Sequence, residues 1–238
     1  MQMRFNRSEL ETLKNDFRLT TIESGASVCS EKLLQVSFLN EYLDELRPKF
    51  KAPNYVVTAL QFSKRYAYLV SVHALYAMTA YNKQMELSFQ NIYIEGAEEN
   101  GIWLPKLRLE HLQTIEPIEG EREKWRDTVL RKLFLDHLAP VWQALQNSAC
   151  APVMTLWENT ALYISWLYEQ VLANHPDEVV RKRAAEDFHY LIHEASSELF
   201  GTRFQPLTKF YSPQNTRQTC CLYYQLDGAD YCRTCPKR

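Results

Sequence analysis

Residues 55–81 read YVVTALQFSKRYAYLVSVHALYAMTAY, a largely apolar run that contains neither glycine nor proline. Because glycine and proline interrupt helices most strongly, this run can form a helix of several turns. A helix that is apolar on nearly every side has to be covered by other parts of the protein. Residues 67–81, its most apolar part, fall short of the roughly 20 residues that span a bilayer and include His73. The pattern therefore predicts a helix buried in a protein core.

The residues before this run predict two further helices. Ser8 and Glu11 have the spacing of a capping box, in which two side chains satisfy the first unpaired amides of a helix. Apolar side chains then recur at helical spacing as far as Pro48, where we expect the second helix to end. These apolar positions are Leu33, Leu34, Val36, Leu39, Tyr42, Leu43 and Leu46.

The second half of the chain also has helical spacing. A stripe of apolar residues over 125–134 predicts a helix that is interrupted at Pro140 and resumes beyond it. A strongly apolar helix is expected over 153–172, and another over 179–200, which Gly201 can terminate. The chain is therefore expected to be mainly helical.

A different pattern separates the two helical halves. Residues 85–89 alternate between apolar and polar side chains, and residues 92–94 continue the alternation after a change of phase. A loop over 95–101 then leads into a second apolar series over 102–109. This pattern predicts a β-hairpin or small sheet around 85–110. The expected fold class is mainly α with a small β insertion, an α+β arrangement.

Composition excludes several classes of protein. The chain has 238 residues, of which 46% are apolar and 24% charged, as in an ordinary globular protein rather than a disordered one. Its formal charge of -2 does not favour nucleic acid as a partner, because phosphate binding requires a concentrated basic surface. Residues 1–19 lack the apolar region of a secretory signal. We therefore expect a cytoplasmic protein without a transmembrane segment.

Glycine is scarce, and this limits the cofactors that the chain could bind. The six glycines nowhere form the G-x-G-x-x-G pattern with which a dinucleotide pyrophosphate is held at a helix start. A flavin- or nicotinamide-dependent reductase of the Rossmann type is therefore disfavoured. If the protein transfers electrons, its cofactor must be one that needs no glycine-rich loop.

The last nineteen residues contain four of the six cysteines. Cys220 and Cys221 are adjacent, ten residues follow, and Cys232 and Cys235 form a C-x-x-C pair. Four thiolates meet the usual demand of a 2Fe-2S cluster, with two sulfurs for each iron. The adjacent pair needs a bend in the chain, because neighbouring side chains of an extended strand point to opposite faces. Since the composition changes beyond Thr202, we expect a body over 1–210 and a cluster-binding segment over 211–238.

Two other uses of these cysteines remain open. A structural zinc ion also accepts four cysteines, although zinc modules usually space both pairs as C-x2-4-C, unlike the adjacent Cys220 and Cys221. Disulfides would require an oxidising compartment, which the N-terminal residues do not indicate. Cys29 and Cys150 stand apart from the other four and are expected to be small buried apolar residues.

The end of the sequence resembles a known family. Arg217-x-x-Cys220-Cys221-x-x-Tyr224, followed by Cys232-x-x-Cys235-Pro236, is similar to the C-terminal iron–sulfur domain of FhuF-type ferric siderophore reductases. The match covers about the last twenty residues. The resemblance implies a cytoplasmic protein that reduces ferric siderophores by electron transfer, with Cys220, Cys221, Cys232 and Cys235 as ligands of a 2Fe-2S cluster.

The implied chemistry is one-electron reduction. Siderophores hold Fe(III) through hard oxygen donors, and these bind the larger and softer Fe(II) far less tightly, so that reduction releases the iron. A separate donor, such as a ferredoxin, a flavodoxin or a reductase, would have to supply the electrons. Hydrogen bonds and positive charge near the sulfurs would adjust the cluster potential. The candidates for this role are Thr219, Thr234, Arg217 and Arg233, which could equally be solvated loop residues.

Basic residues near the cysteines are candidates for binding the substrate. Many ferric siderophore complexes are anionic, and Arg203, Lys209 and Arg217 lie just before the ligands. We expect these three side chains to contact the substrate. Two other functions remain possible on the sequence alone: a binding protein stabilised by zinc without redox activity, and a siderophore-binding protein whose cluster only senses redox state.

A second metal site is conceivable on the predicted helix over 179–200. Glu186, His189 and His193 are spaced so that they could share one helix face. The Glu-x-x-His unit is typical of di-iron carboxylate bundles, but those require a second such unit, which the sequence lacks. Ordinary surface or core histidines are the preferred interpretation.

Overall fold

Most of the residues that the computed structural model describes, 3–212 and 216–238, are helical, as expected from the sequence. Its α-helices are α1 (Arg7–Phe17), α2 (Val36–Phe50), α3 (Tyr55–Ala67), α4 (His73–Tyr81), α5 (Arg122–Leu133), α6 (Ala139–Ala149), α7 (Val153–Trp166), α8 (Glu178–His189) and α9 (Pro206–Phe210). Short 3-10 turns occur at Ser30–Leu34, Leu172–Asn174, Ser197–Phe200 and Tyr223–Gln225.

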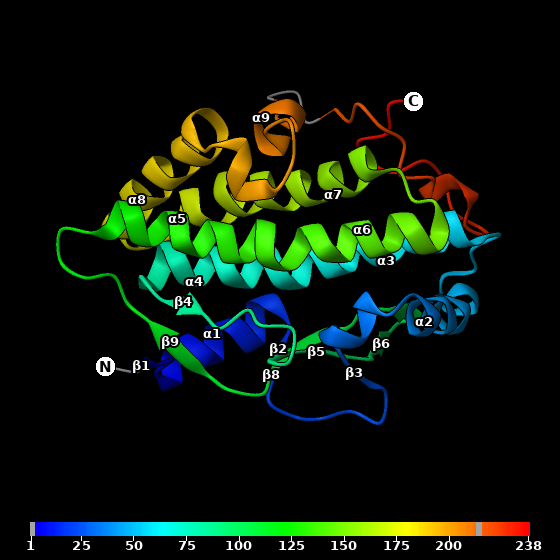
Figure 1. Ribbon diagram of the computed structural model, residues 1–238, viewed down its shortest axis with the longest axis horizontal. Coiled ribbons are helices and arrows are strands. Elements are labelled where there is room, and N and C mark those ends of the chain that lie inside the picture. Colours follow the sequence, from blue (N-terminus) through cyan, green and yellow to red (C-terminus); the bar gives the residue numbers. More distant parts are fainter. Residues whose placement is uncertain (1–2, 213–215) are drawn as a thin grey trace.

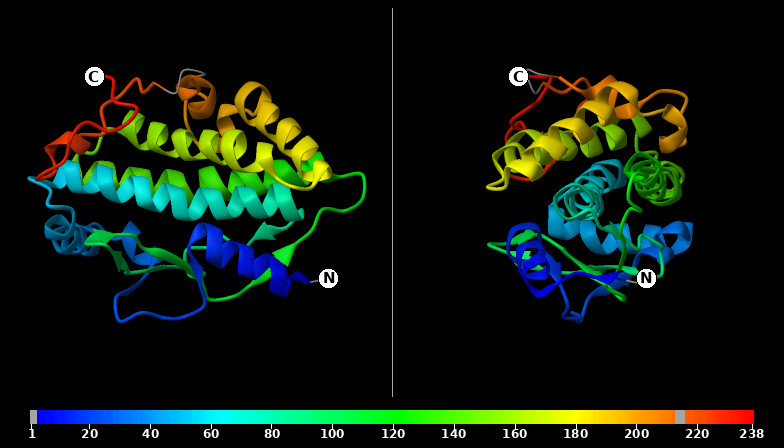
Figure 2. Two further views of the ribbon diagram at one scale, coloured as in Figure 1. Left: turned by 180° about the vertical axis from the view of Figure 1, so that it is seen from behind. Right: turned by 90° about the vertical axis from the view of Figure 1, so that its left-hand side faces the viewer.

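The helices form layers. In Figure 1, α3 with α4 and α5 with α6 form two rods along the long axis of the molecule. Helices α7, α8 and α9 cover one side of these rods, while α1, α2 and the strands cover the other, as the views in Figure 2 also show. The run over 55–81 is therefore covered on both sides, and side chains such as Val57, Leu75 and Met78 are fully buried. Within the described ranges, no helix is both long enough and apolar enough to cross a membrane.

Both rods contain a π-helical segment, and α7 and α8 each run into one, which the sequence pattern did not predict. In the described part of the chain these are Tyr68–Val72, Phe134–Leu138, Leu167–Val171 and Tyr190–Glu194. Each π turn shifts the hydrogen-bonding register by one residue, and the segments at 68–72 and 134–138 continue directly into α4 and α6. The predicted interruption at Pro140 is therefore wrong: Pro140 lies in the first turn of α6, directly after the π segment. A proline is tolerated there because it has no amide hydrogen to leave unpaired.

Three predicted helix ends differ from the structure. The capping box of α1 lies two residues earlier than expected: Asn6 Oδ1 accepts the Glu9 amide at 2.9 Å, and Glu9 accepts the Asn6 amide at 2.8 Å. Helix α2 continues past Pro48 and ends at Phe50. The helix expected over 179–200 ends earlier, after the π segment at 190–194, and a separate 3-10 turn precedes Gly201, which is left-handed with φ 64°. The helix expected over 153–172 is present as α7 and its π extension.

The β insertion is present and is larger than predicted. Its strands are β4 (Gln84–Met85), β5 (Ile92–Glu95), β6 (Glu98–Glu99), β7 (Ile102–Trp103), β8 (Lys106–Leu109) and β9 (Gln113–Ile115). Strands β5 and β8 pair antiparallel, with Ile92 opposite Leu109 and Ile94 opposite Leu107. Three short strands from the start of the chain join these sheets: β1 (Met3–Arg4), β2 (Leu19–Thr20) and β3 (Ser27–Cys29). The described sheets have the orders β1-β9-β4, β2-β8-β5-β3 and β6-β7.

Candidate functional site

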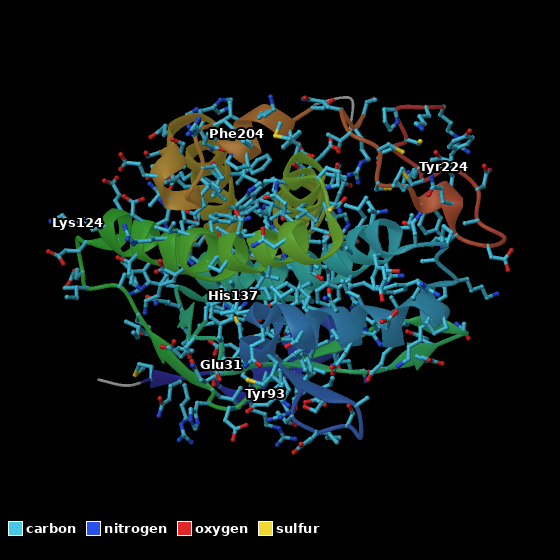
Figure 3. The ribbon with its side chains drawn as sticks, turned by 45° about the vertical axis from the view of Figure 1, so that its right-hand side comes forward. Glu31, Tyr93, Lys124, His137, Phe204 and Tyr224 are labelled. Carbon is cyan, nitrogen blue, oxygen red and sulfur yellow. The ribbon has the colours of Figure 1, made fainter. Side chains whose placement is uncertain are left out.

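The four clustered cysteines lie in a segment with little regular structure, residues 216–238, here called the cysteine segment. It runs along the end of the molecule where α3 and α7 begin (Figures 1 and 2). Figure 3 shows Tyr224, in its short 3-10 turn, at this end and far from Phe204. Cys221 and Cys235 are buried, whereas Cys220 and Cys232 are partly exposed. The chain bends immediately after the adjacent pair, because Leu222 is left-handed with φ 55°.

Two of the four sulfurs already lie together. Cys221 Sγ and Cys232 Sγ are 3.6 Å apart, and the Cys235 amide donates to the Cys232 carbonyl at 3.0 Å. All four thiols are unbridged. In the part of the chain that the structure describes, no three histidine, cysteine or acidic side chains form a ready metal-binding group. Four thiols fit a 2Fe-2S cluster in number and in softness. The sulfurs of Cys221 and Cys232 are already close together, and cluster binding would have to bring those of Cys220 and Cys235 to them.

Lys64 of α3 is a charged group in direct contact with one of these sulfurs. Its Nζ donates to Cys221 Sγ at 3.0 Å. Burial raises the pKa of the Cys221 thiol, but the charges of Lys64 and Arg217 outweigh it, and the resulting pKa is below the usual value. Burial, together with the neighbouring Cys221, raises the pKa of Cys232. Cys221 is therefore the more acidic of the two thiols, and a thiolate is the form that binds metal.

Helix α3 also holds the backbone of the cysteine segment. Gln61 is fully buried, and its Nε2 donates to the Cys221 carbonyl at 2.9 Å. Lys64 and Tyr68 follow Gln61 by three and seven residues, so the three side chains lie on one face of the helix. This face is the one directed toward the cysteines.

Helix α7 supplies a second anchor, in which a buried glutamate holds the residues before Cys220. Glu158 accepts the Thr219 amide at 2.9 Å and the Gln218 amide at 2.5 Å, and also contacts the Thr219 hydroxyl. Its partner cation is Arg217, whose Nη2 lies 3.3 Å from Glu158 Oε2 and donates to Asn159 Oδ1 at 2.8 Å. Both charged side chains are 1% exposed. We call Glu158, Asn159 and Arg217 the loop clamp.

Of the residues expected to adjust the cluster potential, Arg217 acts on Cys221 by its charge, while the side-chain hydrogen bonds of Arg217 and Thr219 go to groups other than sulfur. Arg217 belongs to the loop clamp, and its amide donates to the Thr234 carbonyl at 3.2 Å. The Thr219 hydroxyl bonds Glu158 rather than a sulfur. The observed side-chain donor to sulfur is Lys64, which the sequence reasoning missed. A signal was present, because Lys64 and Arg65 are adjacent cations in a helix that has no other charged residue, and buried cations require a partner.

The three predicted substrate residues differ in their surroundings, although the Gln218 side chain, next to Arg217, donates to the Lys209 carbonyl at 2.6 Å. Arg217 lies beside the cysteines but is buried in the loop clamp. Arg203 and Lys209 are exposed on or near α9, where Lys209 Nζ lies 5.7 Å from the centre of the Phe204 ring. Their contact with a substrate stays a prediction.

An open cleft of about 450 Å³ adjoins the cysteines. Tyr68 of the first π segment and Tyr163 and Trp166 of α7 form its aromatic side, while Cys232 and Arg233 line it from the cysteine segment. Sequence reasoning missed these aromatic residues. Asn159, Leu162, Tyr163 and Trp166 do, however, have helical spacing, which places them on one face of α7.

The other two cysteines and the possible second metal site have simpler explanations. The expectation that Cys29 and Cys150 are buried is wrong: Cys29 is partly exposed at the end of β3, and Cys150 is exposed at the C-cap of α6.

The possible second metal site is on α8 and its π extension. His189 Nδ1 lies 2.9 Å from Glu194 Oε1, and the His189 and His193 rings are 4.9 Å apart. Among the described residues these side chains form no group that could hold a metal ion.

Comparison with known families gives one match over most of the body and one over the cysteine segment. The profile described as "Ferric iron reductase FhuF-like transporter" matches residues 60–215, which is more than half of the chain. The profile described as "FhuF 2Fe-2S C-terminal domain" matches residues 217–237 and therefore all four clustered cysteines. A search of curated proteins found no match. The chain belongs to the FhuF family of ferric iron reductase-like proteins, and the 2Fe-2S C-terminal domain of that family identifies its cofactor as a 2Fe-2S cluster.

Proposed function

We propose that the protein is a cytoplasmic ferric siderophore reductase that delivers one electron to siderophore-bound Fe(III) and thereby releases Fe(II). Cys220, Cys221, Cys232 and Cys235 are the proposed ligands of the cluster. The observation that carries the proposal is the approach of the Cys221 and Cys232 sulfurs to 3.6 Å beside an open cleft. Cys232 lines that cleft, so a molecule bound there touches a proposed ligand.

The chemistry follows from the two oxidation states of the substrate iron. When bound, the 2Fe-2S cluster supplies electrons singly, which matches the step from Fe(III) to Fe(II). The chain holds the ligands in readiness, since the loop clamp fixes the residues before Cys220 and Gln61 fixes the backbone of Cys221. Lys64 stabilises the Cys221 thiolate by charge and by a hydrogen bond.

The proposal includes a division of labour along the chain. Residues 1–210 form the body that provides the aromatic side of the substrate cleft, and residues 211–238 form the cluster-binding segment, which completes the cleft. The electrons come from a separate donor, a ferredoxin, a flavodoxin or a reductase, because the sequence has no dinucleotide fingerprint. The formal charge of -2 gives no reason to expect a nucleic-acid partner.

Anaerobic spectroscopy with a single-turnover assay tests the proposal. The protein, purified without oxygen, should contain iron and acid-labile sulfide in equal amounts and lose colour on reduction with dithionite. After removal of excess dithionite, mixing with a ferric siderophore and an Fe(II) chelator should regenerate the oxidised spectrum while the Fe(II) complex forms. Zinc without sulfide would instead identify a structural metal site, and siderophore binding without Fe(II) formation would identify a redox sensor. Either result would refute the proposed activity.

A further inference from the structure

The contact between the Cys221 and Cys232 sulfurs has the length expected for two ligands of one metal ion. A tetrahedral ion with metal–sulfur bonds of about 2.3 Å holds its thiolates about 3.8 Å apart. The two sulfurs are 3.6 Å apart. Thiolates on different irons of a 2Fe-2S cluster lie farther from each other, because both irons and the bridging sulfides separate them. The observed distance therefore fits two ligands of the same iron.

The neighbours of the adjacent cysteines differ. Cys221 is buried, and its sulfur accepts a hydrogen bond from Lys64 Nζ at 3.0 Å. Cys220 is partly exposed and lies near Lys237, whose pKa is raised by a hydrogen bond to Tyr224 and, to a smaller extent, by the charge of the Cys220 thiolate. The two side chains therefore meet different parts of the chain, as expected if they bind different irons.

The C-x-x-C pair is divided in a similar way. Cys232 is partly exposed and lines the cleft, whereas Cys235 is buried. The amide of Arg217, three residues before Cys220, donates to the carbonyl of Thr234, the residue before Cys235, at 3.2 Å. This bond holds the chain near Cys220 beside the chain near Cys235. Because each iron takes two sulfurs, Cys220 and Cys235 are the two that remain for the second iron.

The two sulfur pairs also differ in the charge beside them. Lys64 is partly buried and contacts Cys221 directly. Lys237, the cation near Cys220, is exposed, so that water and salt screen its charge. The buried cation Arg217 is offset by its ion pair within the loop clamp. A positive charge and a hydrogen bond at sulfur stabilise the reduced state of a cluster, so Lys64 favours reduction at the iron that Cys221 binds.

We propose that the four cysteines hold the 2Fe-2S cluster in interleaved pairs, so that Cys221 and Cys232 share one iron. Cys220 and Cys235 share the other. Lys64 makes the iron of the first pair the one that a single-electron donor converts from Fe(III) to Fe(II), while the second iron stays Fe(III). Because Cys232 lines the cleft, the electron is held on the side of the cluster that faces the cleft. This inference rests on the proposed function, since it assumes the same four ligands and the same cleft.

Proton NMR of the reduced wild-type protein tests the pairing without a siderophore. In a reduced 2Fe-2S cluster, β-protons of cysteines on the ferric iron have large paramagnetic shifts that decrease on warming, whereas those on the ferrous iron have small shifts that increase. Residues 220–238 begin with a cysteine, so a synthetic peptide of this sequence can be ligated to residues 1–219. The product is the full chain, with one β-deuterated cysteine at a time.

Deuteration of Cys221 or Cys232 should remove signals of the ferrous class, and deuteration of Cys220 or Cys235 should remove signals of the ferric class. The pairing is overturned if Cys221 shares its class with Cys220 or with Cys235. If Cys221 and Cys232 both belong to the ferric class, the role of Lys64 is wrong. Protein with this pairing that releases no Fe(II) from a ferric siderophore would refute the reductase activity alone.

The reduction potential tests Lys64 independently, by a redox titration followed by EPR. At the potential where the wild-type cluster is half reduced, Lys64→Gln should lower the ratio of reduced to oxidised cluster about tenfold, which is about 59 mV for one electron. Lys64→Arg keeps a charged donor and should change the ratio less than about threefold. The control Lys237→Gln removes an exposed cation and should change it less than about twofold. Equal shifts in Lys64→Gln and Lys237→Gln would overturn the role of Lys64.

Discussion

The body and the cysteine segment are held in place by different forces. In the body, helices such as α3, α4 and α7 bury side chains on almost every side, and many apolar residues have no exposed surface. The cysteine segment has only one 3-10 turn among its described residues and is attached by polar contacts from Gln61, Lys64 and Glu158. Apolar burial is the main stabilising contribution to folding, so the body can fold on its own contacts. The segment packs only a few apolar side chains, such as Leu222 and Leu226, against that core, so it depends more on directed bonds and on its cofactor.

This contrast explains how one chain can combine a rigid support with a site that is completed by metal. A segment of this length cannot build its own core, and metal binding supplies part of the folding free energy in such cases. The polar anchors bring Cys221 near Cys232 beforehand, which reduces the ordering that cluster binding must cause. The following experiments test the separation of the two regions, beginning with the largest effect.

Loss of a proposed ligand should abolish the cofactor while leaving the body intact. Cys232→Ser replaces a thiolate with a hydroxyl, which is a poor ligand for iron, and should remove the cluster almost completely. Iron and sulfide analysis and the visible spectrum measure this loss. Far-UV circular dichroism should still report the helical content of wild type, because the helices bury their apolar side chains against one another whether or not the cluster is bound.

The isolated cysteines are the controls. Cys29→Ser and Cys150→Ser should retain the full spectrum, since both residues lie outside the cysteine segment. Equal loss of iron in these variants would contradict the ligand assignment. Collapse of the helical signal in Cys232→Ser would show that the body needs the cluster to fold.

Breaking the loop clamp should lower the stability of the whole protein. Glu158→Leu leaves the Arg217 cation buried without its partner, and such uncompensated charges cost about 3–5 kcal/mol. The free energy of unfolding is measured by urea denaturation followed by circular dichroism. The double variant Glu158→Leu with Arg217→Met should recover much of the loss, because no charge then stays buried.

Glu169→Leu, in the π segment that extends α7, provides a comparison on the same helix. Glu169 accepts a hydrogen bond from the Tyr211 hydroxyl at 3.1 Å and is partly exposed, so its loss should cost less than about 1 kcal/mol. If Glu158→Leu costs equally little, the cysteine segment detaches so easily that Arg217 escapes into water. The two regions would then be more independent than we infer.

Mild acid should destabilise the body through two buried histidines. Burial lowers the pKa of His73 and of His137 from 6.5 to about 4, opposed in each case by a hydrogen bond to a backbone carbonyl, that of Leu69 or Leu87. As the pH falls below 6.5, the unfolded chain therefore takes up protons that the folded protein does not. The free energy of unfolding should fall between pH 6.5 and pH 4, by about 3 kcal/mol for each histidine.

The variant His137→Gln identifies the source of this pH dependence. It should remove about half of the slope between pH 6.5 and pH 4. His111→Gln, at an exposed position outside the core, is the control for loss of an imidazole as such. An unchanged slope in His137→Gln would assign the acid sensitivity to other groups. Figure 3 shows His137 deep between the layers, where its Nε2 lies 2.6 Å from the Tyr66 hydroxyl.

Two left-handed glycines provide the smallest and most direct comparison. Gly201 has φ 64° and lies in the body, where an added Cβ would meet Leu135 Cδ1 at 2.6 Å. Gly228 has φ 74° and lies in the cysteine segment with open space around it. Gly201→Ala should lower the free energy of unfolding by about 2 kcal/mol, from left-handed strain and crowding.

Gly228→Ala carries the same backbone strain but should change global unfolding by less than about 0.5 kcal/mol, because the segment can open locally. Urea denaturation of both variants measures the difference. Equal destabilisation would mean that the cysteine segment unfolds together with the body.

The helical class, the central helix and the β insertion could be predicted because their patterns are long. The apolar run over 55–81 and the series over 153–172 extend over several turns, and tertiary packing preserved both. Strands β1 and β2 have only two residues each, too few to establish any alternation. The π segments also escaped prediction, because a shift of one residue in hydrogen bonding barely changes the apolar spacing.

The residues of the site also differ in how well they could be predicted from the sequence. The cysteines are close in sequence, so their number and spacing indicated a cluster, with zinc and disulfides left as alternatives until the resemblance to the family was considered. The groups that surround them come together only through the fold. Tyr68 meets Trp166 across nearly a hundred intervening residues, and Lys64 reaches Cys221 over a still longer separation. No local pattern contains such information, although the spacing of Gln61, Lys64 and Tyr68 does indicate a shared helix face.

Helix α7 sets the spacing between the two ends of the site. Glu158 grips the loop before Cys220, and Trp166, eight residues later, stands in the cleft. At 1.5 Å per residue, these two positions are about 12 Å apart along the axis, and each residue turns the helix by about 100°. A single inserted or deleted residue between them would swing Trp166 away from the opening and change its separation from the loop. Loops on the surface of a protein can vary in length, but the number of residues between Glu158 and Trp166 has to stay the same.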